Sequence, residues 1–431
     1  MKQLLAYCLS IILCVSFTGC MENYLDLYPE DKITSASFPE NESDIKLLLN
    51  GVYAQLREKE VYNQGLFGFG ITDGATPNAF NWGTDEVFNK LGAGRLSSSD
   101  GGVVTYRWKR CYEIISRANY LLACMDLVDL SEEAKAKYSG ETHFLRGLAY
   151  SVLAETYGGV PIILTNISTE EARSLKRASL EETWQQALDD YEVAITNLGV
   201  DAPEPGRATK GAALGMKMRA YLYQGKYKEV LSCVEQIDAL KKYGLFHSYE
   251  GLFDPANENN KEVLFDIQYI EGENSQGSYI DQYCGTGTGS WTRGSRYVPT
   301  DDLVAAYETI DGSPVDPENP YENRDPRLGF TAVLPGSYFL GYRFPNYLYP
   351  GGAFNHAGNR LKHLSTRKYR IQDESKLPPS GQSYINDIIL RYADVLLSKA
   401  EAIIETNGSV ADAIAILNRI RTETVSYTHL R

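Results

Sequence analysis

The sequence predicts a mainly α-helical protein, with a helical-repeat scaffold interrupted by one loop-rich insertion that contains little β-structure. Apolar residues recur at helical spacing through residues 41–244 and again through residues 386–421. Between these regions, residues 245–385 contain one strand-like run, EVLFDIQY (262–269), among long aromatic-rich loops. Loops of this length are usually functional or disordered, and their aromatic residues argue against disorder. We therefore expect a single domain over residues 41–421.

The N-terminus is expected to be a secretory signal peptide of residues 1–19. Lys2 provides a positive charge, and an apolar run of about 14 residues follows, too short to cross about 30 Å of hydrocarbon. Thr18-Gly19 before Cys20 resembles a bacterial lipobox, in which the cysteine is lipidated and becomes the mature N-terminus. Residues 20–40 are then a lipid-anchored tether. The alternative is an ordinary signal peptide with an incidental cysteine.

Four helices are expected in the first half of the scaffold. The first is capped by Asn41 or Ser43 and carries an apolar stripe that ends at Leu56. The other three are residues 106–125, a helix that carries Phe144, Leu148, Val152 and Tyr157 and stops at Gly158-Gly159, and a helix that opens with the capping box Ser179-Leu-Glu-Glu182. Several large aromatic residues fall on these stripes and are expected in the core: Trp108, Tyr112, Tyr157, Trp184 and Tyr191.

Residues 207–237 predict a closely packed helix pair. The first helix presents small or slim residues on one face, namely Ala212, Ala213, Met216 and Ala220. Gly225-Lys-Tyr227 then forms a tight turn into the second helix. This arrangement resembles a tetratricopeptide repeat, in which close helix approach requires short side chains. A similar helix pair is expected in residues 386–421, NDIILRYADVLLSKAEAII and SVADAIAILNRIR, separated by Asn407-Gly408.

Two loop segments offer the chemistry of a sugar-binding site. Sugars bind through flat aromatic faces together with amides and charges that hydrogen-bond to hydroxyl groups, and the chain contains 31 tyrosines. The segments are ITDGATPNAFNWGTD (71–85) and QGSYIDQYCGTGTGSWTRGSRY (276–297). The candidate ligand-binding residues are Asp73, Asn78, Phe80, Asn81, Trp82, Tyr279, Tyr283, Trp291 and Arg293. For any one aromatic residue, the competing interpretation is that it packs its own loop.

Other functional classes find little support in the sequence. The net charge of −14 argues against nucleic acid or anionic lipid as a partner. GTGTGS lacks the lysine of a phosphate-binding loop, and DGSPVDPEN is interpreted as a turn rather than a calcium loop. No metal-ligand spacing appears, and Cys111 and Cys124 lie too far apart on one predicted helix to form a disulfide. We expect no cofactor, no metal and no catalytic residue, with Asp325 and Asp394 in structural ion pairs or helix caps.

The ordered set of motifs resembles the SusD/RagB family of Bacteroidetes outer-membrane nutrient-binding lipoproteins. The matching pieces are the lipobox with LDLYPED, YEIISRANYLL, THFLRGLAYSVLAETYGGVPIIL, RATKGAALGMKMRAYLYQGKY, NENNKEVLFDIQY, NRDPRL and RYADVLLSKAEAI…LNRIR. The resemblance implies a tetratricopeptide-like scaffold that bears a loop-rich ligand face. It also implies a non-catalytic, cell-surface oligosaccharide-binding lipoprotein that delivers nutrient to a SusC-like TonB-dependent transporter. The resemblance indicates which loop segments form the glycan site, but not which individual residues contact the glycan.

The C-terminus departs from this family pattern. Family members continue beyond LNRIR with a further helical stretch, whereas this chain ends at TETVSYTHLR. We interpret residues 422–431 as a non-native or truncated tail, and we expect the last repeat to expose apolar surface.

Three alternative functions stay open. A related protein could bind peptides for uptake. A lipoprotein glycosidase would need two converging carboxylates, one of them with a raised pKa. A periplasmic repeat scaffold would bind protein through its concave helical face and would not use the loop aromatics.

Overall fold

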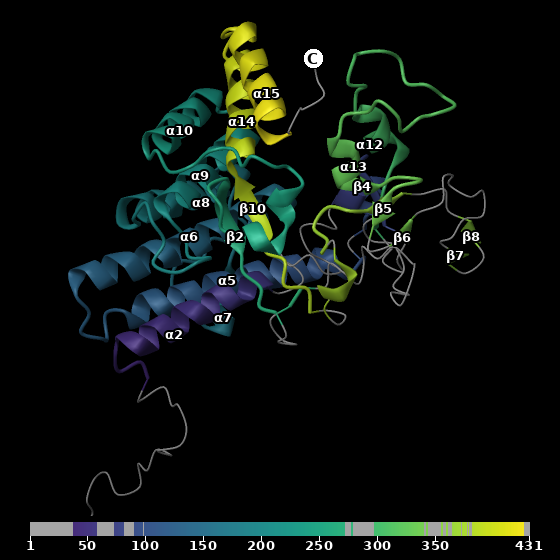
Figure 1. The fold of residues 1–431 in the computed structure, drawn as a ribbon. Coiled ribbons are helices and arrows are strands. Elements are labelled where there is room, and N and C mark those ends of the chain that lie inside the picture. The colour runs from purple at the N-terminus through teal and green to yellow at the C-terminus, as the bar shows by residue number, and fades with distance from the viewer. Residues whose placement is uncertain are drawn as a thin grey trace, which may run out of the picture.

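Helices make up most of the described chain (Figure 1). The computed structural model describes residues 38–57, 73–81, 90–97, 99–271, 277–278, 297–339, 342–343, 355–356, 359–360, 364–371, 373–376, 378 and 382–425. The helices of the scaffold are α2 (Glu42–Tyr53), α5 (Val103–Cys124), α6 (Glu132–Tyr157), α7 (Thr169–Ser174), α8 (Leu180–Asn197), α9 (Lys210–Tyr223), α10 (Tyr227–Ala239), α14 (Tyr392–Glu405) and α15 (Val410–Thr424). The mainly helical fold class is confirmed.

Local capping explains where the helices begin and end. Asn41 caps α2, because its side chain accepts hydrogen bonds from the backbone N–H groups of Ser43 and Asp44. Ser179 and Glu182 form the expected capping box at the start of α8. α6 ends at Tyr157 because Gly158 adopts φ 76°, which breaks the helix. These boundaries agree with the sequence prediction.

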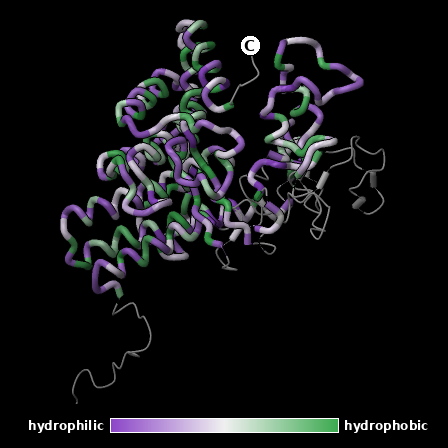
Figure 2. The backbone as a smooth tube through the Cα atoms, in the orientation of Figure 1, coloured by the Kyte–Doolittle hydropathy of each residue, from purple (hydrophilic) through white to green (hydrophobic). Residues whose placement is uncertain are grey.

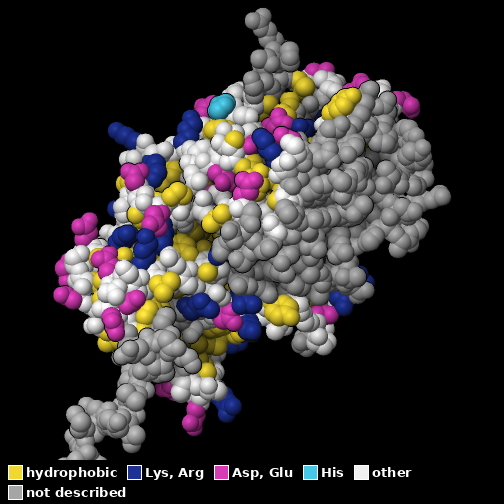
Figure 3. Space-filling view, turned by 60° about the horizontal axis from the view of Figure 1, so that its bottom comes forward, with side chains coloured by type: hydrophobic (Ala, Val, Ile, Leu, Met, Phe, Trp, Pro, Cys, Tyr) yellow, Lys and Arg dark blue, Asp and Glu magenta, His cyan; other side chains and the backbone are white. Residues whose placement is uncertain are grey.

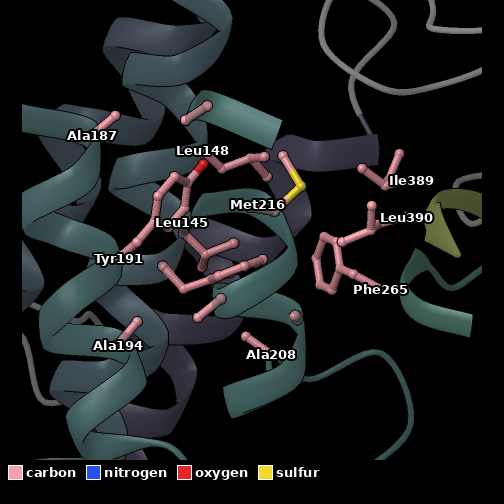
Figure 4. Close-up of a cluster of buried hydrophobic side chains, with 14 of the residues drawn as sticks. Leu145, Leu148, Ala187, Tyr191, Ala194, Ala208, Met216, Phe265, Ile389 and Leu390 are labelled. Atoms are coloured by element: carbon pink, nitrogen blue, oxygen red, sulfur yellow. The ribbon is translucent and has the colours of Figure 1, made fainter. Parts of the chain in front are cut away.

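The core lies where α6, α8 and α9 meet the strand pair β2 and β10 (Figure 4). Leu145 and Tyr191 are fully buried there, and Phe144 packs edge-on against Phe265 of β2 with ring centroids 4.8 Å apart. Hydrophobic and hydrophilic residues alternate along the helices (Figure 2), and in α8 and α10 the buried apolar residues recur at helical spacing on one face. Trp184 is also buried, and Trp108, Tyr112 and Tyr157 pack partly buried against the core, as expected.

Helices α9 and α10 pack against each other, and the small residues of α9 lie in the interior. Ala212, Ala213 and Ala220 of α9 are all buried. A Cβ atom on Gly215 would lie only 2.2 Å from a methyl group of Leu390, so any larger residue there would force the Leu390 side chain of β10 to move. Gly225 adopts φ 67° in the turn between the two helices, a conformation that favours glycine. The predicted tight helix pair is confirmed.

The helix predicted from residue 386 is wrong in its first turn. Residues Asp387–Arg391 form strand β10, which pairs antiparallel with β2 (Val263–Ile267), and α14 begins only at Tyr392. The run DIILR is rich in β-branched residues, and a short apolar run of this kind does not distinguish a strand from a buried helix by periodicity. Pairing with β2 decides the outcome, because it satisfies the backbone groups of residues 387–390, which are buried.

Elements from residues 297–366 of the insertion, together with residues 79–81 from the first half of the chain, form a smaller lobe beside the helical body, whereas β2 pairs with β10 within that body (Figure 1). β2 fulfils the prediction of a strand in EVLFDIQY. The remaining elements are short: β1 (Ala79–Asn81), β3 (Tyr297–Pro299), α12 (Asp301–Ala306), α13 (Arg327–Thr331), β4 (Ala332–Val333), β5 (Tyr338–Phe339), β6 (Tyr342–Arg343), β7 (Asn355–His356), β8 (Asn359–Arg360) and β9 (Ser365–Thr366). Every described sheet has two strands, so this lobe depends on its turns and side chains for rigidity.

Charged side chains lie on the surface of the protein, whereas the thiols of Cys111 and Cys124 lie in its interior. Lys, Arg, Asp and Glu side chains are interspersed over the helical body (Figure 3). Cys111 and Cys124 are both buried and unbridged, as their spacing predicted. Within the described ranges, no helix combines the length and the apolar character that a membrane span requires.

Candidate ligand-binding site

The structure brings the two predicted ligand segments together. β1 belongs to the segment 71–85, and β3 begins at the last residue of the segment 276–297. The two strands pair antiparallel, with Phe80 opposite Val298 and Asn81 opposite Tyr297. More than 200 residues of chain separate the strands in sequence. The β1–β3 ribbon therefore joins the two loops that the sequence selected on independent chemical grounds.

Short-range hydrogen bonds fix the shape of the first loop. η2 (Asp73–Ala75) turns the chain, and the Thr76 hydroxyl donates to the Asp73 carbonyl at 2.7 Å while accepting from the Asn78 backbone N–H at 3.1 Å. Thr300, after β3, donates its backbone N–H to the Asn78 carbonyl at 3.1 Å and its hydroxyl to the Pro77 carbonyl. The loop is thus tied to the residue after β3 at one end of the ribbon, before β1 begins.

Three of the predicted site residues lie on one exposed stretch. Asp73 and Asn78 are exposed, and 37% of the Phe80 surface is exposed, although Val298 opposite it is buried. Phe80 thus presents part of an aromatic ring at the surface of the ribbon. Asn81 lies in β1, but its side chain is not described. The other predicted residues lie outside the described residues: Cys20, Trp82, Tyr279, Tyr283, Trp291 and Arg293.

Tyr338 is a further candidate that the sequence reasoning did not select. It lies on β5 with 68% of its surface exposed, whereas its neighbour Phe339 is buried beneath the Arg367 guanidinium, 5.8 Å from the ring centre. Arg367 directly follows β9, which pairs with β4 and packs against β3. Tyr338 and Phe80 therefore belong to the same lobe. In Ser337-Tyr338-Phe339 the two successive aromatic residues point to opposite faces of a strand, and this is the sequence signal that could have identified Tyr338.

The buried Arg324 and the half-buried Arg327 hold the lobe together beneath this surface. The Arg324 guanidinium donates to three carbonyl groups, those of Pro320, Val304 and Tyr307, at 2.5–2.7 Å. Arg327 pairs with Asp325, so Asp325 takes the structural role expected of it. Burial alone would raise the pKa of Asp325, but the hydrogen bonds and charge of Arg327 outweigh it and hold that pKa below its ordinary value. Asp394 likewise pairs with Arg219.

The acids with raised pKa values lie away from this lobe. Among the described residues they are Glu141, Glu155, Glu258 and Asp266, and burial is the main cause in each case. Glu141 and Glu155 belong to α6. Glu258 and Asp266 both hold Asn386, whose backbone N–H donates to Glu258 at 2.7 Å and whose amide donates to Asp266 at 3.1 Å. The described residues also contain no group of three side chains suited to a metal ion.

Two family models match this chain in succession. A SusD-like model described as "Starch-binding associating with outer membrane" matches residues 23–222, and the SusD family model matches residues 261–422. The chain belongs to the SusD/RagB family. The two matches leave only residues 223–260 between them, so the family assignment covers both the helical scaffold and the insertion of this SusD/RagB protein.

Relatives of similar architecture cover nearly the whole chain. A SusD-like protein, P25, of Formosa agariphila is 26% identical over 97% of this chain and 81% of its own length. A SusD-like protein of Bacteroides ovatus is 24% identical over 94% of this chain and 73% of its own length. These alignments extend the family resemblance across the helices and the smaller lobe together.

Solved structures support the fold. A SusD-like carbohydrate-binding protein from Bacteroides fragilis is 26% identical, with a TM-score of 0.77 over 90% of this chain and 80% of its own. A laminarin-binding SusD-like protein, 20% identical, has a TM-score of 0.70 over 90% of this chain and 85% of its own. At 20% identity, the similarity to the laminarin-binding protein supports the fold alone.

Proposed function

We propose that this SusD/RagB protein is a non-catalytic, surface-exposed lipoprotein that binds oligosaccharides and delivers them to a SusC-like TonB-dependent transporter of the outer membrane. The ligand docks on the lobe built around the β1–β3 ribbon. Aromatic side chains stack on the sugar rings, and neighbouring amides and carboxylates bind the hydroxyl groups.

The convergence of the two loops at the β1–β3 ribbon carries the proposal. Phe80 is exposed beside Asn78 and Asp73, which gives one apolar face and two polar groups within eight residues. This is the composition of a site for a polar, ring-shaped ligand. The Bacteroides fragilis relative described as carbohydrate-binding shares the fold at 26% identity, which supports the same ligand class here.

The distribution of acids supports binding without cleavage. A glycosidase needs a general acid with a raised pKa in its ligand cleft. In the described part of this chain, the carboxyl groups with raised pKa values are held in the helical body and beside β2, and Asp325 in the lobe is paired with Arg327. These acids serve packing and hydrogen bonding.

The membrane attachment belongs to the same proposal. Lipidation of Cys20 would anchor the mature chain in the outer membrane, with no basic patch required. The lobe would then close over the mouth of the transporter and release the oligosaccharide into it. Mass spectrometry of the N-terminal peptide would show the acyl chains, and co-purification from membranes would show the transporter.

Calorimetry with a panel of oligosaccharides tests ligand binding. Protein that starts after Cys20 should bind at least one of them, and Trp82→Ala and Trp291→Ala should each weaken that binding. Tyr120→Ala is the matched control, because Tyr120 is 40% exposed on α5, in the helical body. Binding of peptides in place of sugars would identify a peptide-uptake protein, and release of shorter sugars would identify a glycosidase. Either result, or equal affinity in all variants, would refute the proposal.

A further inference from the structure

An open pocket of about 330 Å³ lies in the helical body, and no residue of the β1–β3 ribbon lines it. Its walls are the loop 201–207 between α8 and α9, the residues Lys242 and Tyr243 after α10, and the turn 259–261 before β2. Residues 263–266 of β2, most of them buried, form its floor. α8, α9, α10 and β2 belong to the helical body, whereas α12 and α13 lie in the smaller lobe (Figure 1). The volume is close to the lower limit of about 300 Å³ for small-molecule sites, so the pocket suits a ligand of one ring.

Contacts within the protein hold the pocket walls in place. A Cβ atom on Gly211 of α9 would lie 2.3 Å from the Tyr243 ring, so this ring lies directly against the helix. The Tyr243 and Thr209 hydroxyl groups are 3.1 Å apart and share a hydrogen bond. The Gly244 backbone N–H donates to the Lys261 carbonyl at 3.1 Å, which joins the segment after α10 to the turn before β2. The pocket is therefore formed before a ligand arrives, and this lowers the free-energy cost of binding.

Two lysine side chains lie on the same side of the pocket. Lys261 is exposed and makes no ion pair in the described part of the chain. Its ammonium group lies 3.9 Å from the position that a Cβ atom on Gly244 would take, beside the wall after α10. Lys242 of that wall pairs at 2.9 Å with Asp201, whose side chain is 89% exposed. Because so exposed a pair contributes little free energy, Lys242 is also available to an anion.

The acidic side chains of the pocket are bound within the protein. Glu204 pairs with Lys46 of α2 at 2.6 Å. Asp266 is 4% exposed, and both of its oxygens accept hydrogen bonds from side-chain amides. Among the described lining residues, Lys261 is thus the exposed charged group that no opposite charge neutralises. An exposed cation above an apolar floor favours an anionic ligand.

The net charge of −14 does not prevent an anion from binding here. At physiological ionic strength, exposed charges more than about 8 Å apart are largely screened from each other. The lysines of the pocket therefore affect a small anion more strongly than acidic residues elsewhere on the surface do.

Two asparagines offer hydrogen bonds to hydroxyl groups. The side-chain amides of Asn259 and Gln268 exchange hydrogen bonds at 3.0 and 3.4 Å. The Asn260 amide donates to the Asn257 carbonyl and accepts from the Glu262 backbone N–H, both at 2.8 Å. An amide has two N–H donors and two acceptor lone pairs, so each asparagine keeps one of each beyond these contacts. A hydroxyl group both donates and accepts, and therefore matches them.

We propose that this pocket binds one acidic sugar ring, a hexuronate, either free or at the end of an oligosaccharide. The Lys261 ammonium binds the carboxylate, with Lys242 beside it. The amides of Asn259 and Asn260 bind hydroxyl groups, and the Tyr243 ring and the floor contact the apolar face of the sugar. The pocket is separate from the β1–β3 ribbon, so this proposal does not rest on sugar binding at the ribbon.

Ligand-observed NMR titration of the full chain tests the proposal. The probes are D-galacturonate and D-galactose, which differ only in the carboxylate at C6. Galacturonate should bind with a Kd of about 1 mM, as expected for so small a ligand, and galactose at least about tenfold more weakly. Lys261→Gln should weaken galacturonate binding about tenfold, because it removes a hydrogen bond to a charged group. Lys228→Gln is the matched control, since it removes the same charge from an exposed position of α10 that does not line the pocket.

The remaining arms separate the occupant and the two sites. Digalacturonate binding at equal or higher affinity supports a chain end as the occupant, and its exclusion supports the free acid. A neutral oligosaccharide that binds at the ribbon should not compete with galacturonate, and Lys261→Gln should leave its affinity unchanged. Absence of galacturonate binding at millimolar concentration would overturn the proposal, whatever the ribbon binds. Equal binding of galactose, or equal affinity for galacturonate in Lys261→Gln and the unmodified protein, would overturn it as well.

Discussion

Arg146 and Asp190 form an ion pair in the helical core that joins α6 to α8. The Arg146 guanidinium donates to both Asp190 oxygens at 2.7–3.2 Å and to the Asn119 side-chain oxygen at 2.8 Å. The Asn119 amide in turn donates to the Ile163 carbonyl at 3.0 Å. Because the Arg146 and Asp190 side chains are 7% and 2% exposed, each depends on the other for compensation of its charge.

We expect Asp190→Ala to destabilise the protein by roughly 3–5 kcal/mol, because it leaves the Arg146 charge buried without a partner. Denaturant unfolding followed by circular dichroism measures the change. Lys46→Ala is the matched control, since the exposed pair of Lys46 with Glu204 contributes about 1 kcal/mol or less. Equal losses in the two variants would contradict this account of the core.

At the ligand lobe, Phe80→Ala should weaken oligosaccharide binding about two- to tenfold, the loss expected for one stacking contact of 0.5–1.5 kcal/mol. Titration calorimetry with the best-binding oligosaccharide measures it. The thermal midpoint should stay close to that of the unmodified protein, because Phe80 is 37% exposed. Unchanged affinity would remove Phe80 from the site.

Glycines and short strands decide how the elements approach one another. A Cβ atom on Gly159 would lie 2.0 Å from the Ala178 carbonyl oxygen and 2.7 Å from the Ser179 carbonyl carbon, both backbone atoms. The end of α6 is thus in direct contact with the start of α8. The sequence predicted that the helix ends at Gly158-Gly159. It did not reveal that Gly158 is needed for its positive φ and Gly159 for the close approach of the chain.

Gly159→Ala should destabilise the fold by about 1–3 kcal/mol through overpacking, since backbone atoms have little freedom to move aside. Gly101→Ala should have almost no effect, because a Cβ atom there would contact nothing within 4 Å. Thermal unfolding of both variants compares the two sites. If both variants melt alike, the close contact of α6 with α8 is not required for stability.

The last helix has an apolar outer face. Val410, Ile414 and Leu417 of α15 are 60%, 51% and 40% exposed, at i, i+4 and i+7 spacing. This agrees with the apolar surface expected on the last repeat. Helical stacks normally end on a polar face, which keeps them soluble.

Ile414→Lys/Leu417→Lys should reduce self-association at high protein concentration, with the free energy of unfolding changed by less than about 1 kcal/mol. Sedimentation velocity measures the association. Ala415→Lys adds a charge to the same helix away from the row and is the control. Equal association in the three proteins would show that the row is not adhesive.

On the scale of the whole molecule, Glu258, Asp266 and Asn386 connect the helical scaffold to the insertion. Burial raises the pKa of Glu258 to about 7 and that of Asp266 to about 6. Asn386, at the start of β10, is held by both carboxyl groups and accepts the Tyr269 backbone N–H at 3.0 Å. The folded protein therefore binds protons here more tightly than the unfolded chain does.

The sign of the pH dependence follows from these raised pKa values. The stability contributed by proton binding is fully present below the ordinary pKa values of 4.5 and 3.8, and it is lost as the pH rises through about 6 and about 7. We expect Glu258→Gln/Asp266→Asn to reduce the fall in unfolding free energy between about pH 5 and pH 7. Denaturant unfolding at several pH values measures the slope. A slope equal to that of the unmodified protein would contradict the prediction, and Asp302→Asn, at an exposed position, is the control.

Much of the fold follows from the sequence through local rules. Asn41 and Ser179 cap their helices by hydrogen bonds within four residues, and Gly158 ends α6 by its own conformation. The alanines of α9 indicate close packing, because small side chains on an apolar helix face mainly allow a neighbouring element to approach. Such signals depend on neighbours along the chain, so the sequence alone reports them.

The sequence by itself determined the helical class and the loop-rich insertion, and it predicted which two segments carry the chemistry of a ligand site. The tertiary structure decided that DIILR pairs with β2 as a strand, that Phe80 lies opposite Val298, and that Tyr338 shares their lobe. These outcomes depend on contacts between segments far apart in the chain. Their free energy comes from burial and pairing that no local window of sequence contains.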